Sequence, residues 1–129
     1  MTVTVAKSVL LSSLSKDGRY CSDGNLRGAC FVGFLAQMGE EVSLDELASW
    51  FDVHVETGQV SIACKGCAPD WQRQCVTRTY FYAHQLHGAI ECESCNGLGK
   101  FPESPNGCYC GECGMTGYRN VASNGHERR

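Results

Sequence analysis

Two copies of one eight-residue unit constrain the fold of this chain more than any other feature of its sequence. The copies lie at residues 92–99 (CESCNGLG) and 110–117 (CGECGMTG), with fourteen residues between the two cysteine pairs. A Cys-x-x-Cys turn presents two sulfurs on one side of a knuckle, and two facing knuckles supply the tetrahedral ligand set that zinc prefers. The glycines after each pair permit the positive φ angles that turn backbone amides toward the thiolates. The pattern therefore predicts one structural Zn²⁺ held by Cys92, Cys95, Cys110 and Cys113.

A four-thiolate zinc site has no vacant position for a water molecule, so its expected role is to fold the segment around it. Cys108 could replace Cys110 only at the cost of the knuckle geometry, and we interpret it as a non-ligand. A thiol oxidoreductase is a weaker alternative, because a redox-active Cys-x-x-Cys unit is expected in a βαβ pattern that this sequence lacks. We therefore expect that the protein is not an enzyme and has no small-molecule substrate.

A second, looser cysteine cluster precedes the knuckles. It consists of Cys64, Cys67 and Cys75, and His84 and His87 follow it. The three cysteines together with one of these histidines could hold a second Zn²⁺. The alternative is that they are packing residues, since the Cys64-x-x-Cys67 turn has no matching second knuckle and buried cysteine behaves as a small hydrophobe. The sequence leaves the second zinc open.

Length and composition indicate a single small domain. The chain has 129 residues, of which 43% are hydrophobic, which is enough for a modest core. Its apolar runs are far shorter than the ~20 residues needed to cross a bilayer, and its amino terminus lacks a signal-peptide pattern. The ten cysteines fit metal binding in a reducing compartment better than disulfides. We therefore expect a cytoplasmic protein that has no membrane segment.

Hydrophobic periodicity predicts a mainly α fold, in which a small helical body carries the zinc-stapled four-cysteine knuckle hairpin near the C-terminus. Apolar residues recur at helical spacing in the segments 4–14, 26–38, 44–51 and 69–88. Ser43 and Glu46 form a capping box at the start of the third helix. The predicted organisation of the domain 1–129 is a helical N-terminal part at 1–52, a candidate DNA-binding region and long helix at 53–88, the zinc module at 89–118 and a flexible tail at 119–129.

The segment 52–63 admits two interpretations. In a helix-turn-helix unit, a second helix beginning near Val55 would present Thr57 and Gln59 to solvent. In a β-hairpin, the strands 52–56 and 59–63 would be joined by a turn at Thr57 and Gly58, with alternate valines packed on the helices. Either structure could contact nucleic acid, and the sequence leaves both open.

The charge distribution limits how the chain could contact nucleic acid. The net charge of −3 excludes a polybasic coat, so DNA contacts must be local. Residues 57–90 form the most basic long region, whereas residues 38–56 contain six acids and no base, which suits a basic partner protein. The predicted DNA contacts are Thr57, Gln59, Lys65, Arg73 and Arg78.

The two knuckles, together with Tyr118 directly after the second, resemble the zinc module of the phage lambda Q family of transcription antiterminators. The aromatic segment 79–84 (TYFYAH) is similar in placement, and the resemblance covers residues 75–118. The knuckles also look like the cysteine-rich module of DnaJ chaperones, which normally has four such motifs and a His-Pro-Asp motif that this chain lacks. The length of the chain points to a shortened relative of the bacterial lysis-cassette type.

This resemblance implies a transcription antitermination factor. Members of the family bind promoter-proximal double-stranded DNA, load onto paused RNA polymerase and line the RNA exit channel, so that terminator hairpins cannot form. The residues that we expect at the polymerase or in the RNA channel are Lys100, Phe101, Tyr109 and Tyr118. The alternative, from a different class, is a zinc-stabilised protein-binding module, either chaperone-like or an inhibitor of a host protein, that binds no DNA.

Overall fold

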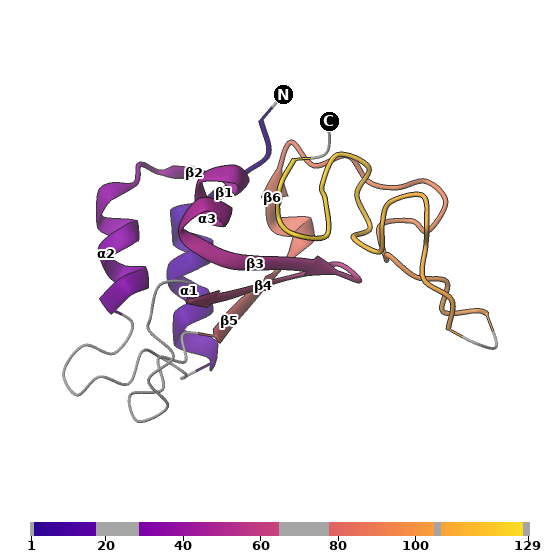
Figure 1. Cartoon of the computed structure of the whole chain (residues 1–129), viewed down its shortest axis with the longest axis horizontal. Coiled ribbons are helices and arrows are strands. Elements are labelled where there is room, and N and C mark those ends of the chain that lie inside the picture. The colour runs from indigo at the N-terminus through magenta and orange to yellow at the C-terminus, as the bar shows by residue number, and fades with distance from the viewer. Residues whose placement is uncertain (1, 18–28, 65–77, 105–106, 128–129) are drawn as a thin grey trace.

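The computed structural model describes residues 2–17, 29–64, 78–104 and 107–127 (Figure 1). Within these residues the chain forms three α-helices and two three-stranded antiparallel sheets, with strand orders β2-β1-β6 and β3-β4-β5. The predicted mainly α fold is therefore wrong, because strands are as prominent as helices. None of the described helices is both long and apolar enough to span a membrane.

The first sheet is built around the amino terminus. Strand β1 (Thr4–Ala6) lies between β2 (Glu41–Ser43) and β6 (Leu86–His87). Val3 and Val5 are fully buried while the threonines between and beside them are not, which is the period-two alternation of a strand. Helix α1 (Lys7–Asp17) follows directly, so the helix predicted at 4–14 begins three residues later than expected.

Two further helices agree with the prediction in the part of the chain that the structure describes. Helix α2 spans Ala29–Gln37 and helix α3 spans Leu44–Trp50. Ser43 is the N-cap of α3, and its hydroxyl accepts a 3.0 Å hydrogen bond from the amide of Glu46. Phe34 of α2 packs edge-to-face on Phe51, with ring centroids 5.3 Å apart, so α2 is anchored to the start of the second sheet.

The β-hairpin interpretation of the central segment is correct, and the helix-turn-helix interpretation is wrong. Strands β3 (Phe51–Glu56) and β4 (Gln59–Cys64) are joined by a two-residue turn at Thr57 and Gly58, with φ angles of 50° and 79°. Positive φ at both residues is typical of the type I′ turns that match the twist of a hairpin. Val53 faces Ile62 and Val55 faces Val60 across the pair, and all four side chains are buried.

The long helix predicted at 69–88 is also wrong where the structure describes it. Strand β5 (Arg78–Tyr82) pairs with β4, the 3₁₀-helix η1 (Ala83–Gln85) follows, and β6 then joins the other sheet. Phe81 is buried whereas its neighbour Tyr82 is 44% exposed, as expected for successive residues of a strand. Aromatic and β-branched residues favour a strand when a partner strand is present, and β4 supplies that partner. Residues 69–77 of the predicted helix lie outside the described residues.

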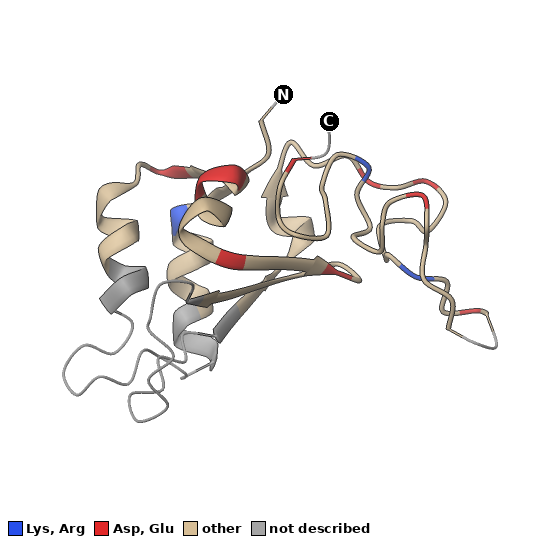
Figure 2. Cartoon of the chain, viewed as in Figure 1, with Lys and Arg blue, Asp and Glu red and all other residues tan. Residues whose placement is uncertain are grey.

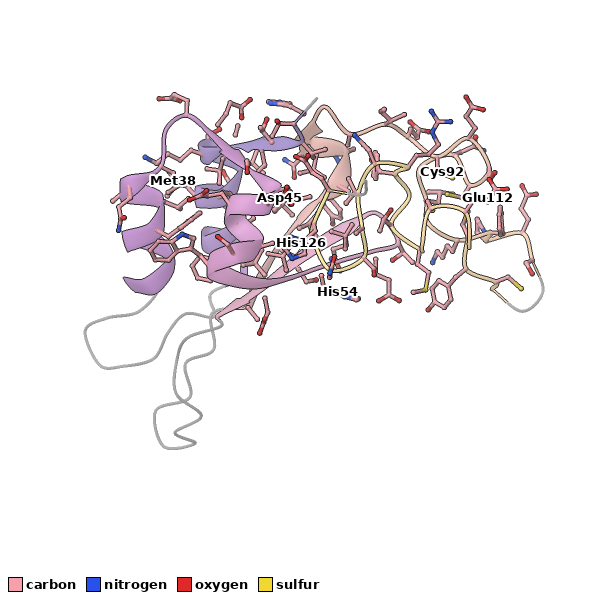
Figure 3. All side chains as sticks on the ribbon, turned by 45° about the horizontal axis from the view of Figure 1, so that its top comes forward. Met38, Asp45, His54, Cys92, Glu112 and His126 are labelled. Atoms are coloured by element: carbon pink, nitrogen blue, oxygen red, sulfur yellow. The ribbon has the colours of Figure 1, made fainter. Side chains whose placement is uncertain are left out.

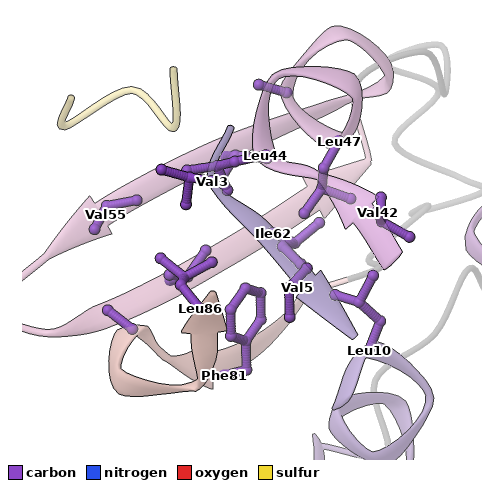
Figure 4. Close-up of a cluster of buried hydrophobic side chains, with 14 of the residues drawn as sticks. Val3, Val5, Leu10, Val42, Leu44, Leu47, Val55, Ile62, Phe81 and Leu86 are labelled. Carbon is purple, nitrogen blue, oxygen red and sulfur yellow. The ribbon is translucent and has the colours of Figure 1, made fainter. Parts of the chain in front are cut away.

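One buried cluster joins the two sheets, and its centre is shown in Figure 4. The cluster extends from Val3 to Val121, which is fully buried. The carboxylate of Glu127 accepts a 2.7 Å hydrogen bond from the amide of Val3, and the amide of Val55 donates to the carbonyl oxygen of Ser123 at 2.8 Å. The predicted flexible tail at 119–129 is therefore wrong for residues 119–127, which are held against both sheets.

Candidate metal centre

The four cysteines of the two knuckles come together in the part of the molecule that lies away from α2, where Figure 3 labels Cys92. All four Sγ atoms lie within 4.8 Å of one another. The Sγ atoms of Cys92 and Cys110 are 3.8 Å apart, and those of Cys95 and Cys113 are 3.7 Å apart. Each cysteine is at most 3% exposed. The prediction is confirmed to this extent: Cys92, Cys95, Cys110 and Cys113 form a buried group that can hold a metal ion.

The two knuckles have the same backbone conformation, with equivalent residues 18 positions apart in the sequence. Positive φ angles occur at residues 96, 97 and 99 of the first knuckle and at residues 114, 115 and 117 of the second. The amide of Gly99 donates a 3.2 Å hydrogen bond to Sγ of Cys95, and the amide of Gly117 donates one of the same length to Sγ of Cys113. The sequence repeat is therefore a structural repeat, and each half supplies two thiols and one N–H···S bond.

The two halves also fit into each other reciprocally. The amide of Cys92 donates to the carbonyl oxygen of Gly117 at 2.9 Å, and the amide of Cys110 donates to that of Gly99 at 3.0 Å. A Cβ atom on Gly99 would lie 2.4 Å from the carbonyl oxygen of Met115, and one on Gly117 would lie 2.3 Å from that of Gly97. Glycine is thus required at both positions by close backbone approach as well as by positive φ.

Burial and hydrogen bonding together determine the protonation of the thiols. It raises the pKa of the Cys113 thiol to about 12, despite the hydrogen bond from the Gly117 amide, and it raises the pKa of the Cys95 thiol as well. At Cys110 burial also acts to raise the pKa, but hydrogen bonds from the backbone at Cys113 and Glu112 outweigh it, and the pKa is lowered. A metal ion that binds here must displace protons from Cys95 and Cys113, and its positive charge compensates the buried thiolates.

The hairpin of the second sheet docks directly on the knuckles. The amide of Thr57 donates a 2.6 Å hydrogen bond to the carbonyl oxygen of Met115, and the amide of Gly58 donates to that of Thr116 at 3.3 Å. The hydroxyl of Thr116 is fully buried and bonds to backbone atoms of Cys113 and Tyr118. Sequence reasoning missed this junction, because no local pattern indicates which turn packs on the metal module.

The predicted DNA contacts are only partly within the described residues. Thr57 lies in the hairpin turn against the metal module, and Gln59 is the first residue of β4. Lys65 and Arg73 lie outside the described residues, and of Arg78 only the backbone, at the start of β5, is described. The same holds for the second cysteine cluster: Cys67 and Cys75 lie outside the described residues, as does the side chain of Cys64, so a second zinc stays a prediction.

The residues predicted to contact polymerase differ in their exposure. Lys100 and Tyr109 face each other in an antiparallel bridge, and both are exposed, Tyr109 by 53%. Phe101 instead packs against the cysteine cluster, and Tyr118 is only 8% exposed. The surface of the module therefore presents Lys100 and Tyr109, whereas Phe101 packs on the cysteine cluster and Tyr118 belongs to the buried cluster that joins the two sheets.

The surroundings of the four cysteines include Cys108 and one contact between the two turns. Cys108 is exposed and does not belong to the group of four, in agreement with its interpretation as a non-ligand. The hydroxyl of Ser94 donates a hydrogen bond to the carboxylate of Glu112, so the central residues of the two Cys-x-x-Cys turns are joined. Sequence reasoning missed this contact, although the 18-residue repeat places Ser94 and Glu112 at equivalent positions and could have indicated it.

No protein-family model matches the chain, and comparisons with curated proteins and with solved structures find no match either.

Proposed function

We propose that the four cysteines hold one Zn²⁺ as a structural centre. A tetrahedral site with Zn–S bonds of ~2.3 Å has sulfur–sulfur edges of about 3.8 Å. The Sγ separations of 3.8 Å and 3.7 Å agree with this edge, and the two N–H···S bonds would stabilise the thiolates. Four thiolates complete the tetrahedron, so the zinc would stabilise the fold and leave no position at which to activate water.

We propose that the chain acts by binding, as a non-enzymatic transcription antitermination factor. The observation that carries this proposal is the pair of repeated knuckles, whose pattern resembles that of the lambda Q family. Figure 1 shows the metal module extending away from the helices, and within this module Lys100 and Tyr109 face each other in an antiparallel bridge. A metal-stapled projection is suited to occupy the RNA exit channel of RNA polymerase, with these two exposed side chains as the contacts.

Contact with promoter-proximal DNA is the second part of this proposal, and it must be local. Among the side chains that the structure describes, eleven are carboxylates and three are basic, namely Lys7, Lys100 and Arg119 (Figure 2). The whole chain, with 11 basic and 14 acidic side chains, has a net charge of −3, so any DNA contact would have to be local and made by Gln59 together with Lys65, Arg73 and Arg78. Arg73→Ala would then weaken DNA binding and reduce the slope of log affinity against log salt concentration by about one.

The test is a terminator read-through assay combined with co-purification of RNA polymerase. Lys100→Glu and Tyr109→Ala are expected to keep the metal content of the wild type and to lose read-through, because both side chains lie on the surface of the module. Ile90→Ala is the control, since Ile90 is 42% exposed but lies where the module joins the body. A wild-type protein that neither binds polymerase nor supports read-through would refute the antitermination proposal while leaving the zinc site intact.

The net charge of −3, and the six acids without a base in residues 38–56, favour a second candidate, a zinc-stabilised protein-binding module that does not bind DNA. This candidate would prevent aggregation of an unfolded protein or inhibit a host protein. It would show no salt-dependent binding to DNA and no read-through, and its metal would still be required for folding. The same read-through assay and a DNA-binding titration therefore separate the two candidates.

A further inference from the structure

A cleft of about 300 Å³ lies where the first knuckle meets the hairpin turn. One side of the cleft is the turn at Thr57 and Gly58, and another is His84 of η1. The remaining walls come from the metal module and include Glu91, Leu98 and Tyr118. The cleft is at the lower end of the size range of small-molecule sites, which suits it to a single side chain rather than to a larger ligand.

The carboxylate of Glu91 is the charged group of this cleft. Its side chain lies over Gly97, since a Cβ atom on that glycine would be 2.9 Å from Cγ of Glu91 and 3.1 Å from Cδ. Glu91 is exposed and takes part in none of the ion pairs among the residues that the structure describes. The cleft therefore contains a carboxylate that forms no ion pair with another described residue.

The cleft that contains this carboxylate is also lined by His84 and by Leu98, and Tyr82, which is outside the lining, supports His84. The ring of His84 stacks on that of Tyr82, with centroids 5.7 Å apart and an angle of 8° between the planes. Tyr82 is 44% exposed, and Leu98, on the knuckle side, is 46% exposed. The planar guanidinium group of arginine can pair with a carboxylate through two hydrogen bonds. Its flat face can cover an aromatic ring, and the methylene groups of the arginine side chain can cover aliphatic surface.

We propose that this cleft binds an arginine side chain from a basic segment of a partner protein. The inference rests on the proposed function only in that the chain acts by binding a protein. Charge complementarity supports the choice of partner, because the cleft carries the carboxylate of Glu91 and the whole chain has a net charge of −3, which favours a basic segment over a nucleic acid. Glu91 would pair with the guanidinium, while Leu98 and the ring of His84, which stacks on Tyr82, would cover the rest of the side chain.

The test is a calorimetric titration of the zinc-loaded chain with a short Arg-Gly-repeat peptide, and with Lys-Gly and Glu-Gly repeats of equal length. Glu91→Gln is expected to weaken binding of the arginine peptide about tenfold, as expected for loss of a charged hydrogen-bonded pair. Glu103→Gln is the matched control, because it removes the same charge at an exposed position that does not line the cleft. The lysine peptide is expected to bind more weakly than the arginine peptide.

Several outcomes would overturn the inference. An equal loss of affinity in Glu91→Gln and Glu103→Gln would mean that net charge alone attracts the peptide. Equal affinity for the lysine peptide would exclude guanidinium recognition, and the absence of any binding of the arginine peptide would exclude the site. Binding that depends on Glu91 in a protein that fails the read-through assay would support the inference and refute only the antitermination proposal.

Discussion

The amide of Thr57 donates a 2.6 Å hydrogen bond to the carbonyl oxygen of Met115, and this bond joins the second sheet to the second metal knuckle. Gly99 of the first knuckle passes the same point, since a Cβ atom on it would lie 2.9 Å from Cα of Thr57. The hairpin turn and both knuckles therefore share one closely packed junction. Because the junction is made of backbone atoms, it can adjust little to a change in any of the three segments.

Gly99→Ala is expected to lower the free energy of unfolding by at least about 2 kcal/mol, because the new Cβ would meet the carbonyl oxygen of Met115 at 2.4 Å in a positive-φ conformation. Gly111→Ala is the matched control, since a Cβ atom there meets nothing within 4 Å. Its expected change is within about 0.5 kcal/mol. Urea unfolding of the zinc-loaded variants measures both, and equal changes would contradict the close approach at Gly99.

Cys95→Ser is expected to abolish metal binding and to unfold the module, because apparent zinc-binding energies of roughly 10–16 kcal/mol also serve as folding energy in such small modules. Cys108→Ser tests the specificity of this result, since Cys108 is exposed and outside the group of four. It should keep one zinc per chain. Metal analysis of protein purified without chelators gives the ratio, and loss of zinc in Cys108→Ser would refute the ligand set.

Chelation of the wild-type protein should disturb the hairpin as well as the knuckles, because the Thr57 and Gly58 amides donate to carbonyl groups of the second knuckle. Hydrogen exchange at these two amides is expected to accelerate on removal of the metal. The amide of Val5, in the other sheet, should be affected less. Equal acceleration at all three positions would indicate global unfolding instead of loss of the junction.

Burial, and to a smaller extent the charge of Glu91, raises the pKa of Tyr118 above its ordinary value of 10.0. Because the folded pKa is the higher one, the neutral phenol contributes stability that is fully present below pH 10.0 and lost as the pH rises through the folded pKa. Glu91→Gln should lower the pKa of Tyr118 but keep it above 10.0, since the burial remains. The difference in tyrosinate absorbance between each protein and its Tyr118→Phe variant measures this pKa, and an unchanged value would place the carboxylate away from the phenol.

The features that the sequence predicted correctly are those determined within a few residues. The cysteine spacing and the following glycines define each knuckle locally. The two knuckles are 18 residues apart in the sequence, and their equivalent cysteines lie in contact. The cap of α3 depends only on Ser43 and Glu46. The hairpin with its turn at Thr57 and Gly58 was one of two open alternatives, the other being a helix-turn-helix unit. The alternating valines in the two strands are the signal that favours the hairpin.

The features that the sequence did not predict depend on contacts between distant segments. The apolar residues before and after Tyr82 recur at helical spacing. The segment forms a strand instead, because β4 pairs with it. The short strand at Val5 is stabilised by β2 and β6, which come from much later in the chain. Val121 and Ala122 are flanked by polar residues, and no periodic apolar pattern includes them. Only the packing of Val121 in the folded protein shows that it belongs to the core.

Thr57→Asn is expected to raise the free energy of unfolding by about 0.5–1 kcal/mol. Thr57 has a φ angle of 50°, which is unfavourable for a β-branched residue, whereas asparagine tolerates this conformation and is preferred in type I′ turns. The substitution keeps the backbone amide that bonds to Met115. The control is the same substitution at Thr4, which lies in the central strand β1, where asparagine has a lower strand propensity and should destabilise the fold. Urea unfolding of both variants is the measurement, and a loss of stability in Thr57→Asn would show that the threonine side chain contributes more at the junction than its backbone conformation costs.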